Sequence, residues 1–378
     1  MRVAINALFW NQPATGSGQY VRRLAAHLTE QAPDLELVLV APQGTTVHRP
    51  PAAAASVSAR HSAQNGFSKL LYEQLSFVRL ARDAGADLLH VPYFAPPRRP
   101  ALPMIVTVHD LIPLLLRGYR GGPLVRAYTA WVAHAAQRAD RVLTDSHSAA
   151  RDIMQHLHLP ADRVQVVYLA ADDKYHPVLP ENDEELASAR ERLRLPGRYL
   201  LYLGGFDCRK QVPELLEAYS RSGIAAEWPL VVAGRLPGSD STFSPDPRPI
   251  ADALGLGDSV LFTGWVDEAD KPALYRGARA FVFPSLYEGF GLPVLESLAC
   301  GTPVVACHGS SLEEVAGPGG LLVDSADPDA LADALRRLAL DDALHAALAR
   351  AGLAHSRTFS WRTTARETAR AYREVLHG

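Results

Sequence analysis

The chain has 378 residues, which is too long for one ordinary hydrophobic core and predicts two domains. Hydrophobic residues make up 48% and charged residues 21%, a composition typical of a soluble globular protein. The sequence contains no apolar run that could span a bilayer, no signal-peptide pattern before the first strand and no disulfide framework among its three cysteines. These features predict a cytoplasmic protein.

The net charge of −3 conceals an asymmetry between the two halves. Residues 1–170 hold 17 Lys and Arg against 11 Asp and Glu, whereas the remainder holds 21 against 30. A basic first half favours an anionic partner, such as an acidic membrane face or a lipid-linked phosphate. Ordinary surface variation is the alternative, and we expect no nucleic-acid partner.

Strand-like and helix-like segments alternate along the chain, which predicts an α/β fold with parallel sheets. In the first half the expected strands lie near 3–8, 35–41, 88–91, 104–108, 141–145 and 164–168, with helices near 19–31, 67–84, 124–138 and 148–157. In the second half they lie near 198–203, 229–233, 259–263, 280–283 and 303–306. Prolines and charges at 172–196 predict a domain boundary near residue 175. The last segment, 361–376, is helical in pattern.

Small residues precede the first helix. Gly16 and Gly18 lie in a turn that suits a phosphate, because a helix N-terminus offers N–H donors and partial positive charge. An ordinary loop with a helix cap is the alternative. Val21 occupies the third glycine position of the dinucleotide fingerprint, which counts against a nicotinamide enzyme.

His109 follows an apolar strand directly. The carboxyl ends of strands in open α/β sheets are where ligands bind, so His109 is a candidate site residue. A structural role for this single histidine is the alternative. Asp110 either caps the next turn or orients the imidazole.

A second glycine turn follows the first strand of the second half. Gly204 and Gly205 permit a tight turn, and Arg209 and Lys210 place two cations where a helix begins. A helix N-terminus disfavours cations, so this placement indicates a ligand that they neutralise, such as a diphosphate. A solvated basic pair is the alternative.

The segment from Glu288 to Glu296 is the most informative in the chain. It joins a buried strand to a helix through a turn containing Gly291, so backbone N–H groups can approach a phosphate. The two carboxylates would flank that phosphate and accept hydrogen bonds from hydroxyls on either side of it. A ligand with hydroxyl groups on both sides of a diphosphate is typically a nucleotide sugar.

No cluster of His, Cys and Asp has metal-ligand spacing, so we expect neither a metal nor another cofactor. The stretch Asp327-Pro328-Asp329 is superficially similar to a D-x-D metal motif. We predict instead that Asp327 caps a helix with Pro328 at its first position.

The segment from Phe67 to Arg82 carries an apolar stripe at helical spacing together with basic residues. The stripe consists of Phe67, Leu70, Leu71, Leu75 and Val78. Core packing against a sheet is the favoured interpretation, and contact with a membrane surface is the alternative.

Taken together, these motifs resemble those of the retaining glycosyltransferases of the large GT4 family. The resemblance covers nearly the whole chain and rests on segments 15–18, 109–113, 204–210, 262–266 and 288–296. It implies the GT-B fold, in which two Rossmann-like, doubly wound parallel-sheet domains face a central cleft. Residues 1–175 would then bind the acceptor and residues 176–359 the nucleotide-sugar donor, with the C-terminal helix at 360–378 crossing back to the first domain.

The resemblance also implies roles for individual residues. Glu288 would hold hydroxyls of the donor sugar and Glu296 the ribose hydroxyls. Arg209 and Lys210 would contact the diphosphate, and His109 would lie beside the reacting sugar.

Backbone groups of the glycine turns would contribute to donor binding as well, at Gly16, Gly18, Gly204, Gly205, Phe290, Gly291 and Leu292. Many family members carry arginine where this chain has Gly205, so Arg209 would have to supply that charge.

The predicted function is transfer of a hexosyl group, with retention and without a metal, from a nucleotide-diphosphate sugar to a saccharide or lipid-linked acceptor. GDP-mannose is the first donor candidate, because the motifs look most like those of bacterial mannosyl- or rhamnosyl-type polysaccharide enzymes. Peripheral contact with the inner membrane face is an additional expectation. A nucleotide-sugar epimerase of similar fold and a non-catalytic nucleotide-sugar-binding protein are the alternatives.

Overall fold

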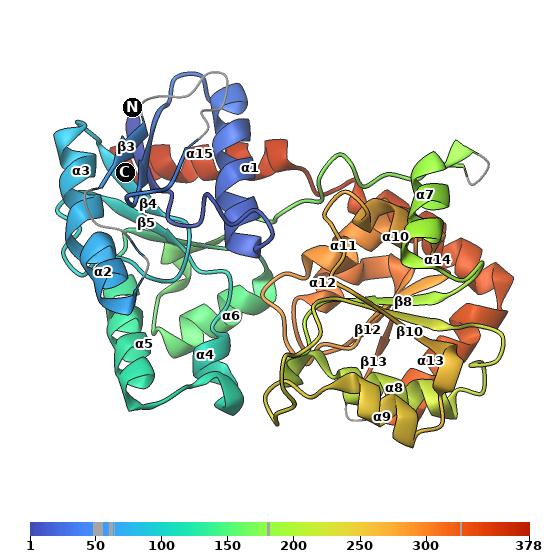
Figure 1. Ribbon diagram of the computed structural model, residues 1–378. Helices are drawn as coiled ribbons and strands as arrows, with labels where there is room; N and C mark the ends of the chain where they lie inside the picture. Colours follow the sequence, from blue (N-terminus) through green and yellow to red (C-terminus); the bar gives the residue numbers. More distant parts are fainter. Residues whose placement is uncertain (48–55, 60–62, 64, 180–181, 326) are drawn as a thin grey trace. The chain divides into compact units, whose positions relative to one another are not determined.

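The computed structural model describes residues 1–47, 56–59, 63, 65–179, 182–325 and 327–378. The chain divides into two compact units, one formed by Met1–Leu169 with Ser360–Gly378 and the other by Ala170–Phe359 (Figure 1). The division lies after Leu169, whereas the sequence places it near residue 175. Within the described part of the chain, no helix is both long and apolar enough to cross a membrane.

The first unit is built on a parallel sheet with the strand order β3-β2-β1-β4-β5-β6-β7. Its strands are β1 (Arg2–Asn6), β2 (Glu36–Ala41), β3 (Ser56–Ser58), β4 (Leu88–Val91), β5 (Met104–Thr107), β6 (Arg141–Thr144) and β7 (Val164–Val166). Most of these strands are apolar on both faces because helices cover the sheet on both sides. The short edge strand β3 has no counterpart among the predicted strands.

The helices of this unit connect successive strands. They are α1 (Gly16–Gln31), α2 (Gly66–Leu71), the π-helical turn η1 (Tyr72–Ser76), α3 (Phe77–Asp83), α4 (Ile112–Leu115), η2 (Arg117–Tyr119), α5 (Pro123–Ala136), α6 (His147–His156) and η3 (Ala161–Arg163). The C-terminal helix α15 (Trp361–His377) also belongs here. Thr364 Oγ1 on α15 donates to the carbonyl of Tyr168 at 2.7 Å.

The segment expected as one amphipathic helix at 67–84 is divided by the π-helical turn. A π turn adds a residue to the helical repeat and rotates the following side chains relative to those before it. Val78 is buried, whereas Phe67 is 71% and Leu75 63% exposed. The predicted stripe is therefore split between core and solvent, and Tyr72 and Phe77 fill the core in its place.

The second unit has a parallel sheet with the order β10-β9-β8-β11-β12-β13. Its strands are β8 (Leu200–Leu203), β9 (Leu230–Ala233), β10 (Val260–Gly264), β11 (Ala280–Phe283), β12 (Val304–Cys307) and β13 (Gly320–Val323). The first five are close to the predicted ranges, and β13 is additional. Both sheets are doubly wound, since the strand order reverses next to β1 in the first and next to β8 in the second.

The helices of the second unit are α7 (Glu184–Leu193), η5 (Cys208–Lys210), α8 (Val212–Arg221), α9 (Pro247–Ala253), η6 (Gly257–Ser259), α10 (Lys271–Gly277), α11 (Leu292–Ala299), α12 (Leu312–Ala316), η7 (Gly317–Gly319), α13 (Pro328–Leu340) and α14 (Asp342–Ser356). Asp327 caps α13 by accepting from the backbone N–H groups of Asp329 and Ala330 at 3.0 and 2.9 Å. The predicted cap with Pro328 at the first helical position is therefore confirmed.

Candidate active site

Two loops meet at the carboxyl edge of the second sheet, where the strand order reverses. One follows β8 and the other follows β11, and these strands are parallel neighbours. Both loops therefore leave the sheet at the same edge, the usual ligand position in an open α/β sheet. The backbone N–H of Leu286 donates to the carbonyl of Arg209 at 2.9 Å and ties the two loops together.

Three charged side chains from these loops form a single cluster, which we call the Arg209–Lys210–Glu288 cluster. Arg209 Nη1 lies 2.5 Å and Lys210 Nζ 2.6 Å from the same Glu288 oxygen, Oε1. Arg209 Nη1 also donates to the carbonyl of Tyr287 at 2.7 Å. The Lys210 ammonium lies 4.3 Å from the centroid of the Phe283 ring, a favourable cation–π contact. Sequence reasoning selected these three charged residues from separate segments, and the fold brings them together.

The protonation states of the cluster follow from burial and charge. Burial opposes the ionised form of Glu288, but the adjacent Lys210 and Arg209 outweigh it and hold the pKa of Glu288 below its ordinary value. Burial lowers the pKa of Lys210, with Glu288 opposing that shift. Asp207 Oδ1 lies 3.5 Å from Arg209 Nε and adds a second carboxylate. These carboxylates supply the counter-charge that the helix start itself does not provide.

The backbone around this cluster adopts conformations that few residues tolerate. Gln211, which precedes α8, has φ 50°, a left-handed value that is uncommon for a residue with a side chain. Gly291, at the start of α11, has φ 101°, and a Cβ there would lie 2.6 Å from Leu312 Cδ2. Ser311 Oγ lies 2.8 Å from the carbonyl oxygens of both Glu288 and Phe290, to which its single proton can donate, and braces this glycine turn. The turn is therefore fixed by packing on both sides.

Glu296 lies one turn into α11 and is buried. Tyr275 Oη donates to Glu296 Oε2 at 3.0 Å. Burial raises the pKa of Glu296, while Lys271 and the Tyr275 hydrogen bond oppose the shift. The Tyr175 ring packs edge-on against Tyr275, with centroids 5.9 Å apart. Glu296 is thus a partly satisfied carboxylate that can accept further hydrogen bonds.

In the first unit, His109 pairs with a carboxylate that sequence reasoning missed. His109 Nδ1 lies 2.6 Å from Asp145 Oδ2, and Nε2 lies 3.2 Å from the carbonyl of Pro92. The pair forms because β5 and β6 are parallel neighbours and both residues follow their carboxyl ends. Asp110 instead accepts from the backbone N–H of Ile112 at 2.9 Å, so it caps the next turn. The polar residue at the end of an apolar strand was the available signal for Asp145.

Both ring nitrogens of His109 therefore face acceptors, an arrangement that suits the protonated imidazolium. Burial opposes the charge, but Asp145 outweighs burial through charge and hydrogen bonding, so the pKa of His109 is raised above its ordinary value.

A buried hydrogen-bond chain lies next to this pair. Tyr372 Oη on α15 is 2.7 Å from His90 Nδ1, and His90 Nε2 is 2.8 Å from Thr107 Oγ1. Thr107 Oγ1 is in turn 3.0 Å from Tyr20 Oη, and the Tyr20 ring packs edge-on against His109 with centroids 4.9 Å apart. Burial lowers the pKa of His90 to about 3, so this histidine is neutral. The sequence signal for this series of hydrogen bonds was a histidine inside an otherwise apolar strand.

The Asp145 contact leads to a testable pH dependence. Asp145→Asn removes the carboxylate that raises the pKa of His109, so His109 should lose its proton at a lower pH. Stabilisation from the pair is fully present below the unfolded histidine pKa of about 6.5 and is lost as pH rises through the raised folded pKa. The melting-temperature difference between the unchanged chain and the variant should therefore be largest in acid and narrow towards alkaline pH. A difference that grows with pH would contradict this account, and NMR titration of His109 measures the pKa directly.

The structure distinguishes the predicted glycines. A Cβ on Gly16 would meet nothing within 4 Å, which leaves its backbone open to a ligand, whereas a Cβ on Gly18 would lie 2.0 Å from the carbonyl oxygen of Gln12. Close packing therefore explains Gly18. A Cβ on Gly204 would lie 2.9 Å from Tyr202 Oη, but one on Gly205 would make ordinary contact with Asp207. The loop therefore has room for a side chain at position 205.

Among the residues that the structure describes, no group of three or more His, Cys, Asp or Glu side chains could hold a metal ion. The predicted site residues fall into two sets. Arg209, Lys210, Glu288, Glu296 and the Phe290–Leu292 turn lie in the second unit, and Gly16 and His109 lie in the first.

Comparison with known proteins agrees with these features. Residues 14–175 match the sequence profile of Glycosyltransferase Family 4, and residues 183–355 match that of glycosyl transferases group 1. The O-antigen chain mannosyltransferase B of Escherichia coli is 30% identical over 77% of this chain and 75% of its own length. The serotype-specific mannosyltransferase WbdA of Escherichia coli is 31% identical over 69% of this chain, which spans only 32% of that longer protein. Sucrose-phosphate synthase from Thermosynechococcus elongatus superimposes with a TM-score of 0.79 at 22% identity, covering 100% of this chain and 99% of that one.

Proposed function

Since the chain belongs to the group 1 glycosyltransferases of family 4 and has their GT-B fold, we propose that it transfers a hexosyl group, with retention, from a nucleotide-diphosphate sugar. The acceptor is a hydroxyl of a saccharide or of a lipid-linked saccharide. The C-terminal unit binds the donor and the N-terminal unit the acceptor. Transfer takes place in the cytoplasm and at its membrane face.

The Arg209–Lys210–Glu288 cluster is the observation that carries this proposal. It places two cations at the carboxyl edge of the sheet, between two loops that also present a glycine turn and a helix start. A departing nucleoside diphosphate gains negative charge as the bond to the anomeric carbon breaks. Preorganised cations stabilise that developing charge without reorganisation, usually a large part of catalysis of this kind.

The other residues have positioning roles in this proposal. The acceptor oxygen bonds to the face of the anomeric carbon that the diphosphate leaves, so the configuration is retained, and the acceptor proton passes to the departing diphosphate. Glu288 holds sugar hydroxyls and His109 contacts the transferred sugar. Positioning of this kind lowers the barrier by fixing the reacting groups in a reactive geometry. Arg209 and Lys210 supply the positive charge that a metal provides in other transferases, so we propose metal-independent transfer.

GDP-mannose is the first donor to test, because two of the similar curated proteins are named as mannosyltransferases. The experiment measures thermal shifts with GDP-, UDP-, dTDP- and ADP-sugars, followed by product analysis with the stabilising donor and saccharide acceptors in the presence of EDTA. A bound donor stabilises the fold by mass action. Isomerisation of the donor without an acceptor would indicate an epimerase, and donor binding without transfer or hydrolysis would indicate a binding protein.

Glu296→Ala should mainly raise the KM for the donor. Loss of hydrogen bonds to a charged group costs about 1.5–3 kcal/mol, which corresponds to a KM increase of about 10- to 150-fold. The turnover number should change little, since this binding is uniform between ground and transition states. Glu296→Gln is the matched variant, because it keeps an acceptor for Tyr275 Oη. An unchanged KM with a reduced turnover number would contradict the assignment.

A further inference from the structure

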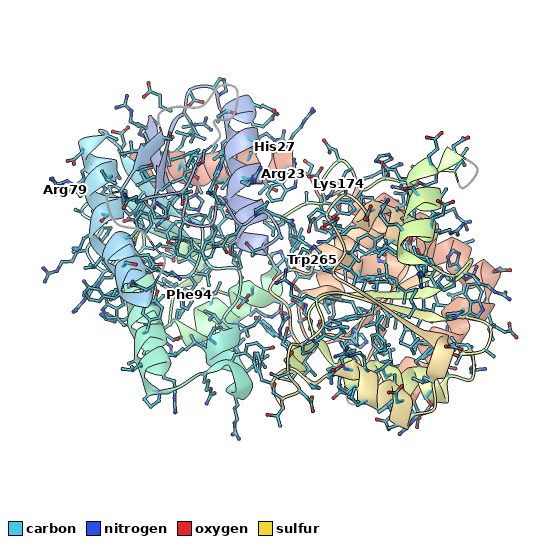
Figure 2. All side chains as sticks on the ribbon, viewed as in Figure 1. Arg23, His27, Arg79, Phe94, Lys174 and Trp265 are labelled. Atoms are coloured by element: carbon cyan, nitrogen blue, oxygen red, sulfur yellow. The ribbon has the colours of Figure 1, made fainter. Side chains whose placement is uncertain are left out.

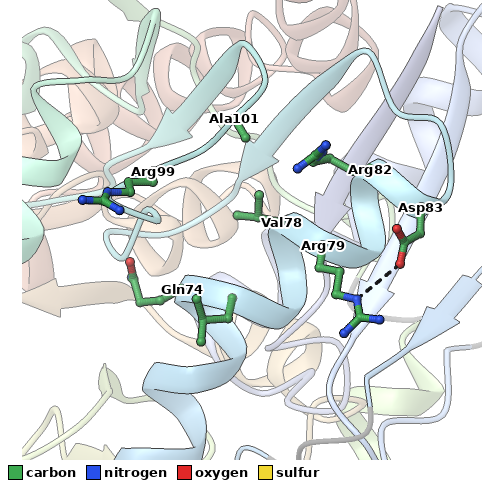
Figure 3. Close-up of a pocket in the computed structure, with 8 residues that line it drawn as sticks. Gln74, Val78, Arg79, Arg82, Asp83, Arg99 and Ala101 are labelled. Carbon is green, nitrogen blue, oxygen red and sulfur yellow. Dashed lines mark ion pairs between the residues drawn. The ribbon is translucent and has the colours of Figure 1, made fainter.

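A pocket of about 350 Å³ in the first unit lies outside the candidate active site. The continuous helical segment of η1 and α3 contributes Gln74, Leu75, Val78, Arg79, Arg82 and Asp83, and the loop between β4 and β5 contributes Arg99 and Ala101. Figure 3 shows Arg79 and Arg82 extending from α3 and Arg99 entering from that loop. We call it the arginine pocket, since three of its eight lining residues are arginines and only one is acidic.

The positive charge of the arginine pocket is largely uncompensated. Arg79 Nε lies 3.6 Å from Asp83, but both side chains are well exposed, at 84% and 62%, and such pairs contribute little. Figure 2 shows Arg79 reaching away from the body of the unit. The side chains of Arg82 and Arg99 make no hydrogen bond or ion pair with any residue that the structure describes.

The position of Arg99 is fixed by its neighbours. Gln74 Nε2 donates to the carbonyl of Pro96 at 3.2 Å, and Gln74 Oε1 accepts from the backbone N–H of Arg98 at 2.9 Å. These two hydrogen bonds clamp the loop before β5 onto η1. The clamp holds the backbone of this loop beside the helix, so Arg99 lines the same pocket as Arg79 and Arg82. Guanidinium groups suit phosphates, to which each can donate two hydrogen bonds.

Exposed apolar side chains lie on the helical segment that lines the pocket, on α2 before it and on α5. Leu75, which lines the pocket, is 63% exposed, and Phe67 on α2 is 71% exposed. Leu124 and Val125, in the first turn of α5, are 87% and 49% exposed. Tyr128 Oη on α5 donates to Glu73 Oε2 on η1 at 3.1 Å, so α5 is anchored to the same helical segment. In Figure 1, α2, α3 and α5 lie next to one another in the first unit.

We propose that the arginine pocket and these exposed apolar residues dock the first unit on an anionic phospholipid surface, with lipid phosphates bound by Arg79, Arg82 and Arg99. Free phosphate would satisfy the arginines but would leave the apolar residues in water. A lipid surface satisfies both, since basic groups bind headgroups while apolar side chains enter the boundary with the acyl chains. Residues 1–170 carry a net positive charge, which is opposite in sign to the charge of an anionic lipid surface. This inference deepens the proposed function, with its lipid-linked acceptor, by assigning the membrane-facing surface.

The test is sedimentation of the full chain with vesicles of phosphatidylglycerol and phosphatidylethanolamine, with phosphatidylcholine vesicles alone for comparison. Binding should require phosphatidylglycerol and weaken with salt. The variant R79Q/R82Q/R99Q should lose about 100-fold in affinity, at about fivefold for each basic residue. R336Q/R337Q/R350Q removes the same charge from exposed positions of the second unit and should bind like the unchanged chain. At high salt, where electrostatic attraction is screened, Leu75→Ser should bind the vesicles more weakly than the unchanged chain does.

Equal binding by the two triple variants would overturn the proposal, as would binding to phosphatidylcholine alone. Stabilisation of the unchanged chain by inorganic pyrophosphate, lost in R79Q/R82Q/R99Q and without vesicle binding, would show a site for a soluble anion and would also overturn it. Transfer to a soluble acceptor should be unaffected in R79Q/R82Q/R99Q. Vesicle binding by a chain without transferase activity would refute the proposed function and leave this docking surface supported.

Discussion

Replacing Lys210 with alanine should lower the turnover number by about 100-fold or more, the usual effect of losing one preorganised donor to a developing negative charge. Lys210 Nζ contacts Glu288 and lies over the Phe283 ring, so its position is determined before a ligand arrives. The measurement is steady-state transfer with the donor identified by the thermal-shift screen.

Arg221→Ala is the matched control, because it removes a cation from the far end of α8, where Arg221 is exposed and pairs with Glu217 and Asp329. This variant should retain normal turnover. Near-normal turnover in Lys210→Ala, with intact folding, would remove Lys210 from the mechanism.

Replacing Glu288 with alanine should destabilise the fold by about 3 kcal/mol, because it leaves two nearly buried cations without their shared carboxylate. Transfer should also fall, since Glu288 is proposed to hold the sugar. A nucleoside diphosphate should then stabilise the variant more than it stabilises the unchanged chain, because its phosphates supply the missing negative charge. Thermal unfolding with and without GDP and UDP measures both effects.

Asp183→Ala is the control for this rescue. Asp183 and Arg276 form an ion pair at 2.5 Å with side chains only 2% and 3% exposed, in the same unit but in other segments of the chain. This variant should be destabilised to a similar extent, but a nucleoside diphosphate should stabilise it no more than the unchanged chain. If the nucleotide rescues neither variant, the diphosphate and Glu288 do not share the two cations.

The second unit could be predicted from sequence in considerable detail. Its strands are apolar runs bounded by glycine turns, and the charged residues lie directly beside those turns. Parallel strands with crossover helices bring all such turns to one edge, so Arg209, Lys210 and Glu288 could be selected without a structure. The contacts of both cations with a single Glu288 oxygen could not be predicted, because they depend on which strands are neighbours.

Other features depend on long-range packing that local patterns do not encode. Asp145 pairs with His109 only because β5 and β6 are adjacent, and no local motif marks that pairing. The π-helical turn is invisible to a hydrophobic pattern that assumes a constant helical period, so the exposure of Phe67 and Leu75 was not anticipated. The strand β3 is too short, and too polar at two of its three positions, for a periodicity argument.

The hydrogen bond between His90 and Tyr372 joins residues that are 282 positions apart. The first unit therefore lacks one of the two partners of a fully buried imidazole until the ribosome has synthesised Tyr372. The second unit, which is continuous from Ala170 to Phe359, has all of its residues earlier. During translation the second unit can therefore complete its fold before the first unit, which needs the C-terminal helix to complete its buried contacts.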